Sequence, residues 1–489
     1  MPVSTHRLLD AIEQLAGTTR EVAPGVCESV AILLQELRQR ESLDALRARY
    51  AEGYRLLAAE LRRPDLDDAL IGAFAALPAQ LEAGREWSAY RSCMERLMEV
   101  IARFCTLHAW PTAQDATYDT AVTRLLAWEG AEHAPHCVPD ARIARPAIDA
   151  ASLQAAIRHA GGAYTNVRVT HETVLGGGLS KTMVLFDAEG VPGGTERLVA
   201  RIESDLPVLE DVYRGMHIPH EYHLIRYLWR NGIPVAEPKL LVGDDNPLAR
   251  HLFLSAYLPG KIKADFRLAL QNLSAEVSNA VASTLALVHH VPVDLHDSDL
   301  QSTHIAIDPP RDRREANLAF VAALERDWRN WKEPVSPLIV TALGWLRAHA
   351  PGAGQPACIV HGDCGLNNLM FDGDRMLGVL DWEAAHYGDP AEDVCWFLYT
   401  LEGIADPAAF IDAYVAAGGE RPDAFTLHYM AVLARLKLLF VRDSVAPRYE
   451  RFGHARPALA VASFAYGPRT MNDLTATLRR AEAVRTDNG

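Results

Sequence analysis

The hydrophobic pattern of the first 145 residues is helical throughout. Apolar side chains recur three and four positions apart, so that each set falls on one face of a helix. The expected helices lie around residues 8–15, 30–37, 43–61, 70–81 and 87–108. No strand-like alternation interrupts them. Several amphipathic helices joined by short loops favour an antiparallel bundle, and we predict an all-helical domain over residues 1–145.

A stretch with three prolines, HAPHCVPDARIARPAID, follows this helical part and is typical of a linker. His133, His136 and Cys137 suggest a metal site at first sight. No second group of ligands stands at zinc spacing, so incidental side chains in a linker are the simpler interpretation. For the helical domain we expect docking on the following domain or self-association of the chain into a homo-oligomer.

Beyond residue 146 the pattern changes to short apolar runs, first typical of strands and then of helices. The expected strands lie at residues 167–170, 172–175, 183–186, 197–202, 234–242 and 251–258. The expected helices lie at residues 152–159, 221–229, 277–290, 394–401, 410–417 and 425–443. Strands followed by a run of helices predict an α+β domain over residues 146–489.

The most informative stretch of this domain runs from residue 358 to residue 394. A short apolar strand is followed by the polar loop HGDCGLNN, and two further apolar runs flank the turn DGDR at 372–375. This pattern predicts a β-hairpin. Closing the hairpin brings Asp381, at the end of its second strand, beside Asn368 and Asp363.

These three side chains suit phosphoryl transfer. One carboxylate accepts the proton of a hydroxyl group, while an amide and a second carboxylate hold magnesium on the phosphates. The spacing His-x-Asp-x-x-x-x-Asn, followed by Asp at a strand end, matches the catalytic and metal-binding loops of kinases. The alternative is a surface hairpin whose Asp and Asn residues only form turns.

HGDCGLNNLMF together with GVLDWEAAHYGDPAEDV closely resembles the aminoglycoside phosphotransferase (APH)-like family of small-molecule kinases. The branch it resembles includes phosphotransferase domains fused to acyl-CoA dehydrogenases. The resemblance covers about residues 150–480 and implies a two-lobed kinase-like fold, with lobes at about 150–258 and 259–489. It implies that Asp363 is the catalytic base, that His361 braces its loop, and that Asn368 and Asp381 bind Mg²⁺. Asn367 replaces a glycine of the family, and we expect Asn to accept a left-handed conformation there.

The resemblance also indicates the nucleotide-binding residues of the first lobe. A glycine-rich turn between two strands stands where a phosphate-covering loop is expected, with Gly176, Gly177, Gly178 and Ser180. Arg201 occupies the strand position of the usual phosphate-gripping lysine, and Glu221 would orient it. An edge-strand surface Arg and a solvated Glu are the alternatives. Ser255 and Tyr257 lie in the expected hinge, where adenine is held by backbone groups.

Composition limits the classes of partner. A net charge of −15 argues against general affinity for DNA, RNA or anionic membranes. The seven cysteines form no CxxC pair, which suits a reducing compartment. The N-terminus lacks the pattern of a secretory signal, and no apolar run is long enough to span a membrane. We therefore expect a cytoplasmic protein.

Together these features predict an enzyme that transfers phosphate from ATP, with Mg²⁺, to a hydroxyl group of a small molecule. The branch resemblance implies a hydroxyacyl-CoA as substrate. An aminoglycoside or macrolide antibiotic is the alternative within the same class. A non-catalytic nucleotide-binding scaffold is the alternative of another class, supported only by Arg201 in place of Lys.

Overall fold

The computed structural model describes residues 147–175, 181–203, 216–263, 273–306, 309–330, 337–402, 404–452 and 468–487. The predicted helical domain over residues 1–145 lies outside these residues and stays a prediction, as does its boundary with the second domain. Gly176, Gly177, Gly178 and Ser180 also lie outside them. The described residues fall into two compact units, one of residues 147–320 and 351–423, the other of residues 321–350 and 424–487.

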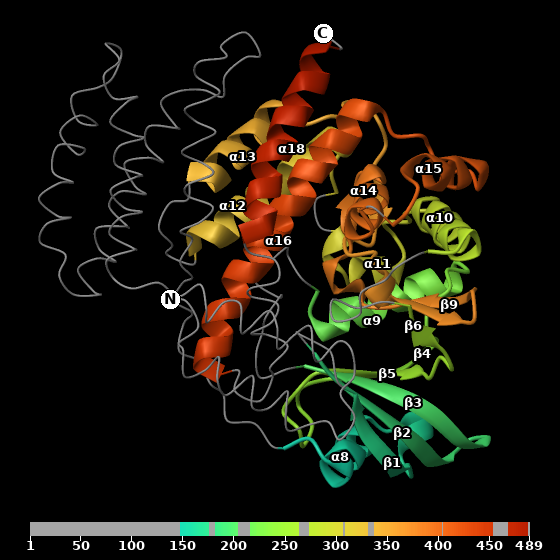
Figure 1. Cartoon of the computed structure of the whole chain (residues 1–489). Coiled ribbons are helices and arrows are strands. Elements are labelled where there is room, and N and C mark those ends of the chain that lie inside the picture. Colours follow the sequence, from blue (N-terminus) through green and yellow to red (C-terminus); the bar gives the residue numbers. More distant parts are fainter. Residues whose placement is uncertain are drawn as a thin grey trace, which may run out of the picture. The chain divides into compact units, whose positions relative to one another are not determined.

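The first unit contains a five-stranded antiparallel sheet (Figure 1). In spatial order its strands are β1 (Arg168–Leu175), β2 (Thr182–Val191), β3 (Gly194–Ile202), β5 (Leu252–Ala256) and β4 (Pro238–Val242). The central strand β3 pairs with β2 on one side and β5 on the other. Arg201 therefore lies on an interior strand, which excludes the alternative of an edge-strand Arg.

The two faces of this sheet carry different helices (Figure 1). α8 (Ala150–Ala160) covers one face and forms an apolar core with alternate residues of the strands, including Phe186 and Leu254. Because side chains alternate along a strand, Arg201 and its cross-strand neighbour Phe253 point to the other face. That face meets α9 (Ile218–Arg230), whose Tyr222 ring lies 5.8 Å from the ring of Phe253.

Two small sheets and several helices complete the first unit. β6 (Lys261–Ile262), β8 (Leu369–Asp372) and β9 (Arg375–Val379) form a three-stranded sheet, and β7 (Cys358–Val360) pairs with β10 (His386–Gly388). The predicted hairpin is thus confirmed as β8–β9. The helices are α10 (Ala275–His289), α11 (Ser298–Gln301), α14 (Ala391–Thr400), α15 (Pro407–Ala416) and the first part of α12 (Arg313–Asn330).

The second unit is helical in its described part. It contains the end of α12 together with α13 (Pro337–Ala348), α16 (Ala424–Phe452) and α18 (Pro468–Asp487). Buried Trp345 of α13 packs against Tyr429 of α16, and its indole N–H donates to Glu482 of α18 at 3.0 Å. Among the described residues no helix is long and apolar enough to cross a membrane. The α+β architecture is confirmed for the part of the chain that the structure describes.

Candidate active site

Asp363 and Asn368 meet at the end of the β8–β9 hairpin. The short 3₁₀ helix Leu366–Asn368 returns the chain toward Asp363, and the Asn368 amide donates to the Asp363 carboxylate at 3.0 Å and to its carbonyl oxygen at 2.9 Å. The N–H of Leu380 donates to the Asn368 carbonyl at 2.8 Å. This bond extends the hairpin register by one step, so Asp381 follows directly beside Asn368. The predicted contact of Asp363 with Asn368 is confirmed, and Asp381 follows the residue whose N–H donates to Asn368.

A buried carboxylate of α14 holds the start of the loop. The Asp393 side chain accepts the N–H groups of His361 and Gly362 at 2.7 and 2.8 Å, and His289 of α10 lies 3.2 Å away. Burial opposes the charge of Asp393. The hydrogen bond and positive field from His289, together with His361, outweigh burial and lower the Asp393 pKa to about 2. Asp393 is therefore a charged brace of the loop.

His361 links the loop to the hairpin. Its Nε2 lies 2.8 Å from the Leu380 carbonyl oxygen, while its Nδ1 accepts the N–H of Asp363 at 3.1 Å. These two partners together fix the neutral tautomer with the proton on Nε2. Gly362 between them has a φ of 77°, and a Cβ there would meet the carbonyl oxygen of Ala384 at 2.5 Å. His361 thus braces the loop, and only glycine fits beside it.

Asn367 does not adopt the left-handed conformation that we expected of it. Among the non-glycine residues of this loop and hairpin, positive φ occurs instead at Asp381, with φ 63° and ψ 64°. Asn367 instead belongs to the 3₁₀ helix and donates its side-chain amide to Asn368 at 2.9 Å. The departure from glycine is therefore accommodated by a side-chain hydrogen bond that glycine lacks.

Arg201 joins the sheet to Asp381 through a buried cluster of charges. Its Nε donates to Glu221 at 2.8 Å, and its Nη2 donates to Asp381 at 2.6 Å and to Glu383 at 3.3 Å. Glu221 is fully buried at 0% exposure, which excludes the alternative of a solvated helix Glu. Its second oxygen accepts the N–H of Trp382, the residue after Asp381, at 3.2 Å. One side chain of α9 thus fixes both Arg201 and the backbone beside Asp381.

The sequence did not identify Lys181 and Glu383 as members of this cluster. Lys181 is 3% exposed, and its Nζ lies 3.8 Å from the Glu383 carboxylate. Burial and the nearby Asp381 raise the Glu383 pKa to about 8, against the opposing effects of Arg201 and Lys181. Burial also raises the pKa of Glu221. Three carboxylates face two cations, so one retained proton near neutral pH balances the charge.

Ser255 and Tyr257, the two residues expected in the hinge, lie in β5 and directly after it. Their backbone N–H groups are already engaged within the protein. Ser255 is buried within β5 between β3 and β4. The N–H of Tyr257 donates to the Arg197 carbonyl at 3.1 Å, and the Arg197 guanidinium lies 5.3 Å from the centre of the Tyr257 ring. Tyr257 therefore cannot offer its N–H to a nucleotide without losing this bond. The N–H of Leu258 has no partner among the described residues.

The oxygen ligands present suit a metal that arrives with phosphate. Among the described residues no group of three or more His, Cys, Asp or Glu side chains is arranged to hold a metal ion. Mg²⁺ in phosphoryl transfer is instead bound by one or two protein oxygens together with phosphates and water. The Asn368 amide oxygen, which accepts the Asn367 amide, and the partly exposed Asp381 carboxylate, which meets Arg201, would be the protein oxygens of such a set.

An antiparallel sheet whose central strand carries an Arg paired with a Glu of a neighbouring helix, joined to a loop and hairpin carrying Asp363, Asn368 and Asp381, defines a kinase-like phosphotransferase. The chain belongs to the Phosphotransferase enzyme family (APH), whose sequence profile matches residues 171–433, more than half of its length. The family membership predicted from the sequence is confirmed.

The similar proteins include acyl-CoA dehydrogenase family members, which belong to the branch that the sequence resembles. Acyl-CoA dehydrogenase family member 11 of Gallus gallus is 26% identical over 281 residues, covering 52% of this chain and 34% of the relative. Family member 10 of Mus musculus is 28% identical over 181 residues, covering 37% of this chain and 16% of the relative. The chain thus spans about a third or less of the length of these relatives. Among solved structures, a macrolide 2′-phosphotransferase type I is 21% identical, with a TM-score of 0.43, covering 64% of this chain and 94% of that one.

Proposed function

We propose that the chain is a kinase that uses ATP and Mg²⁺ to phosphorylate a hydroxyl group of a small molecule. In this proposal Asp363 accepts the proton of the hydroxyl, His361 holds its loop, and Asn368 and Asp381 bind the metal. When bound, Mg²⁺ neutralises charge on the phosphates. The remaining positive charge comes from Arg201, oriented by Glu221, and from Lys181. The glycine-rich residues Gly176, Gly177, Gly178 and Ser180 cover the phosphates.

One observation carries this proposal, the contact between the Asn368 amide and the Asp363 carboxylate beside Asp381. It holds the side chain of one proposed metal ligand, Asn368, against the proposed proton acceptor, while Asp381 follows Leu380, whose N–H donates to Asn368. Phosphoryl transfer needs little else from the protein than positioning and charge. A hairpin that served only as a turn would have no need of the buried braces Asp393 and Glu221.

The backbone donor that we propose for the nucleotide base lies one residue further along the hinge than the sequence predicted. Because the Tyr257 N–H is donated to Arg197, we propose that the Leu258 N–H is the backbone donor for adenine. Pro259, which follows, has no N–H to offer. Ser255 would contribute only packing behind the base.

The substrate class proposed is a hydroxyacyl-CoA, whose phosphorylated hydroxyl becomes a leaving group. Support comes from the acyl-CoA dehydrogenase relatives, whose names point to acyl thioester chemistry. The alternative substrates are aminoglycoside and macrolide antibiotics. We likewise propose that the protein is located in the cytoplasm and that it forms a homo-oligomer through its helical domain.

The proposal is tested by incubating the protein with ATP, Mg²⁺ and a panel of hydroxyl compounds, followed by mass spectrometry. The panel holds hydroxyacyl-CoAs, aminoglycosides, macrolides and choline. We expect a phosphorylated hydroxyacyl-CoA with the wild type, no product with Asp363→Asn, and normal product with Asp372→Asn. Asp372 is a matched control because it is an exposed carboxylate of the same hairpin. If an antibiotic is phosphorylated instead, the proposed hydroxyacyl-CoA substrate is wrong. If nucleotide binds but no compound is phosphorylated, the non-catalytic nucleotide-binding scaffold is favoured.

A further inference from the structure

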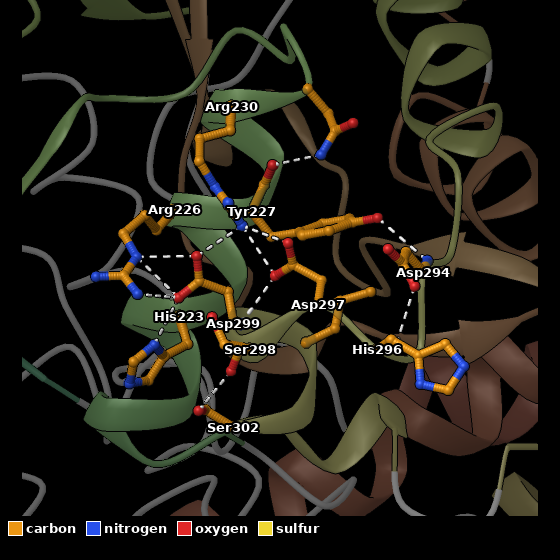
Figure 2. A network of polar contacts seen from close by, with 12 residues as sticks. His223, Arg226, Tyr227, Arg230, Asp294, His296, Asp297, Ser298, Asp299 and Ser302 are labelled. Atoms are coloured by element: carbon orange, nitrogen blue, oxygen red, sulfur yellow. Dashed lines mark hydrogen bonds and ion pairs between the residues drawn. The ribbon is translucent and has the colours of Figure 1, made fainter.

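The helix α9 is held on two faces. Its apolar face and Glu221 lie against the sheet and the active site. On another face stand four polar side chains spaced three and four residues apart, which places them along one line of the helix. These are His223, Arg226, Tyr227 and Arg230, and all of them meet the segment of residues 292–299, which runs from the loop after α10 into α11 (Figure 2).

Asp299 is the centre of this second contact. The Arg226 Nε lies 2.8 and 2.9 Å from its two oxygens, the His223 Nδ1 lies 2.9 Å from one of them, and the Arg230 Nη2 lies 2.8 Å from the other (Figure 2). The residue is 1% exposed. Burial raises the Asp299 pKa, but the hydrogen bonds from Arg226 and His223 outweigh burial and lower it below its ordinary value. Asp299 is thus a charged carboxylate held by three side chains of one helix.

Two further contacts tie the same helix face to the same segment. The Tyr227 hydroxyl donates to the Pro292 carbonyl at 2.6 Å and accepts the N–H of Asp294 at 3.2 Å. Arg230 also reaches Asp297, which caps the start of α11. These contacts are peripheral to Asp299, because Asp297 is more exposed and meets only the last turn of α9.

The position of α9 is transmitted directly to the active site. Glu221 accepts the N–H of Trp382 and the Nε of Arg201, and Arg201 in turn holds Asp381. A shift of α9 would withdraw a buried carboxylate from both partners at once. The left-handed Asp381 backbone would then lose the hydrogen bond that supports its neighbour.

We propose that Asp299 is a positioning residue of the active site, which anchors α9 so that Glu221 stays on Arg201 and Trp382. The inference rests on the proposed function, because it makes binding of metal at Asp381 depend on a residue of α11. Removing the Asp299 charge weakens the attachment of α9, although the contacts of Tyr227 and of Arg230 with Asp297 remain, and it strands no buried charge. The side chains of Arg226 and Arg230 are 40% and 43% exposed and can turn to water.

The test compares wild type with Asp299→Asn by hydrogen–deuterium exchange in the absence of nucleotide. We expect faster exchange of the Trp382 amide and of α9, by about tenfold if the anchor contributes a typical coupling energy. Asp297→Asn is the matched control, since Arg230 keeps its contact with Asp299 and Asn can still cap α11. That variant should exchange as the wild type does.

Activity supplies a second and separable readout. Asp299→Asn should raise the Mg²⁺ concentration for half-maximal turnover about fivefold, and should add nothing in a Glu221→Gln background because both act through one contact. A lowered melting temperature with unchanged Trp382 exchange would overturn the proposal, as would faster exchange with unchanged Mg²⁺ dependence. If the wild type phosphorylates nothing, the proposed function fails, and the exchange comparison alone then decides whether Asp299 anchors α9.

Discussion

Replacing Asp393 by Asn tests whether a buried charge holds the catalytic loop. The carboxylate accepts the N–H groups of His361 and Gly362 on separate oxygens, whereas an asparagine side chain has only one acceptor oxygen. The Asp393 pKa falls from 3.8 to about 2 in the folded protein. A lowering of nearly two pKa units corresponds to about 2.5 kcal/mol of stability at neutral pH, at about 1.4 kcal/mol for each unit.

The sign of the pH dependence follows from the lowered pKa. A carboxylate with a lowered native pKa contributes its full stability above its unfolded pKa and loses it as the pH falls through the native value. The free energy of unfolding of the wild type should therefore exceed that of Asp393→Asn by about 2.5 kcal/mol at pH 7. By pH 3 about half of this difference should be lost.

Urea unfolding of both proteins across this pH range measures the difference. Asp389→Asn is the matched control on the same turn, because burial raises the Asp389 pKa and the sign should reverse. On acidification the wild type should gain stability relative to Asp389→Asn, which is the opposite of the change expected for Asp393→Asn. An Asp393→Asn gap of equal size at pH 7 and pH 3 would refute the reasoning, since the effect would not then arise from charge.

Three further predictions concern the site. Arg201→Lys should lower turnover about a hundredfold, because one ammonium cannot bridge the three carboxylates that the guanidinium meets. Steady-state kinetics, with Asp372→Asn as the control, would measure this loss of turnover. Gly362→Ala should cost roughly 2 kcal/mol of stability through its positive φ and the blocked space, whereas Gly373→Ala, with φ 57° but open space, should cost less in thermal unfolding. Binding of nucleotide and Mg²⁺ near pH 7 should release a proton from Glu383, because a new cation nearby lowers its pKa from about 8. Calorimetry in buffers of different ionisation enthalpy measures this release. Equal apparent heats in all buffers would show that no proton is released.

The local chemistry of the catalytic stretch could be predicted from the sequence. The hairpin follows from two apolar runs around an Asp-Gly turn, and the place of Asp381 beside Asn368 follows from its register. Both are properties of neighbouring residues. The pairing of Arg201 with Glu221 was predicted as well, although only through the resemblance to a family in which strand and helix meet in this way.

Other features were decided by tertiary contact alone. Lys181, Glu383 and Asp299 carry no signal in their neighbours, because each gains its role from side chains far away in the chain, such as Asp299 from α9. The left-handed conformation occurs at Asp381, and not at Asn367 as expected, for a similar reason. The hydrogen bond from the Trp382 N–H to Glu221 and the ion pair of Arg201 with Asp381 hold the Asp381 backbone. Neither contact can be predicted from the spacing of residues in the sequence. Sequence determines what can form within one hairpin or helix, whereas buried charges are placed by the packing that brings their partners together.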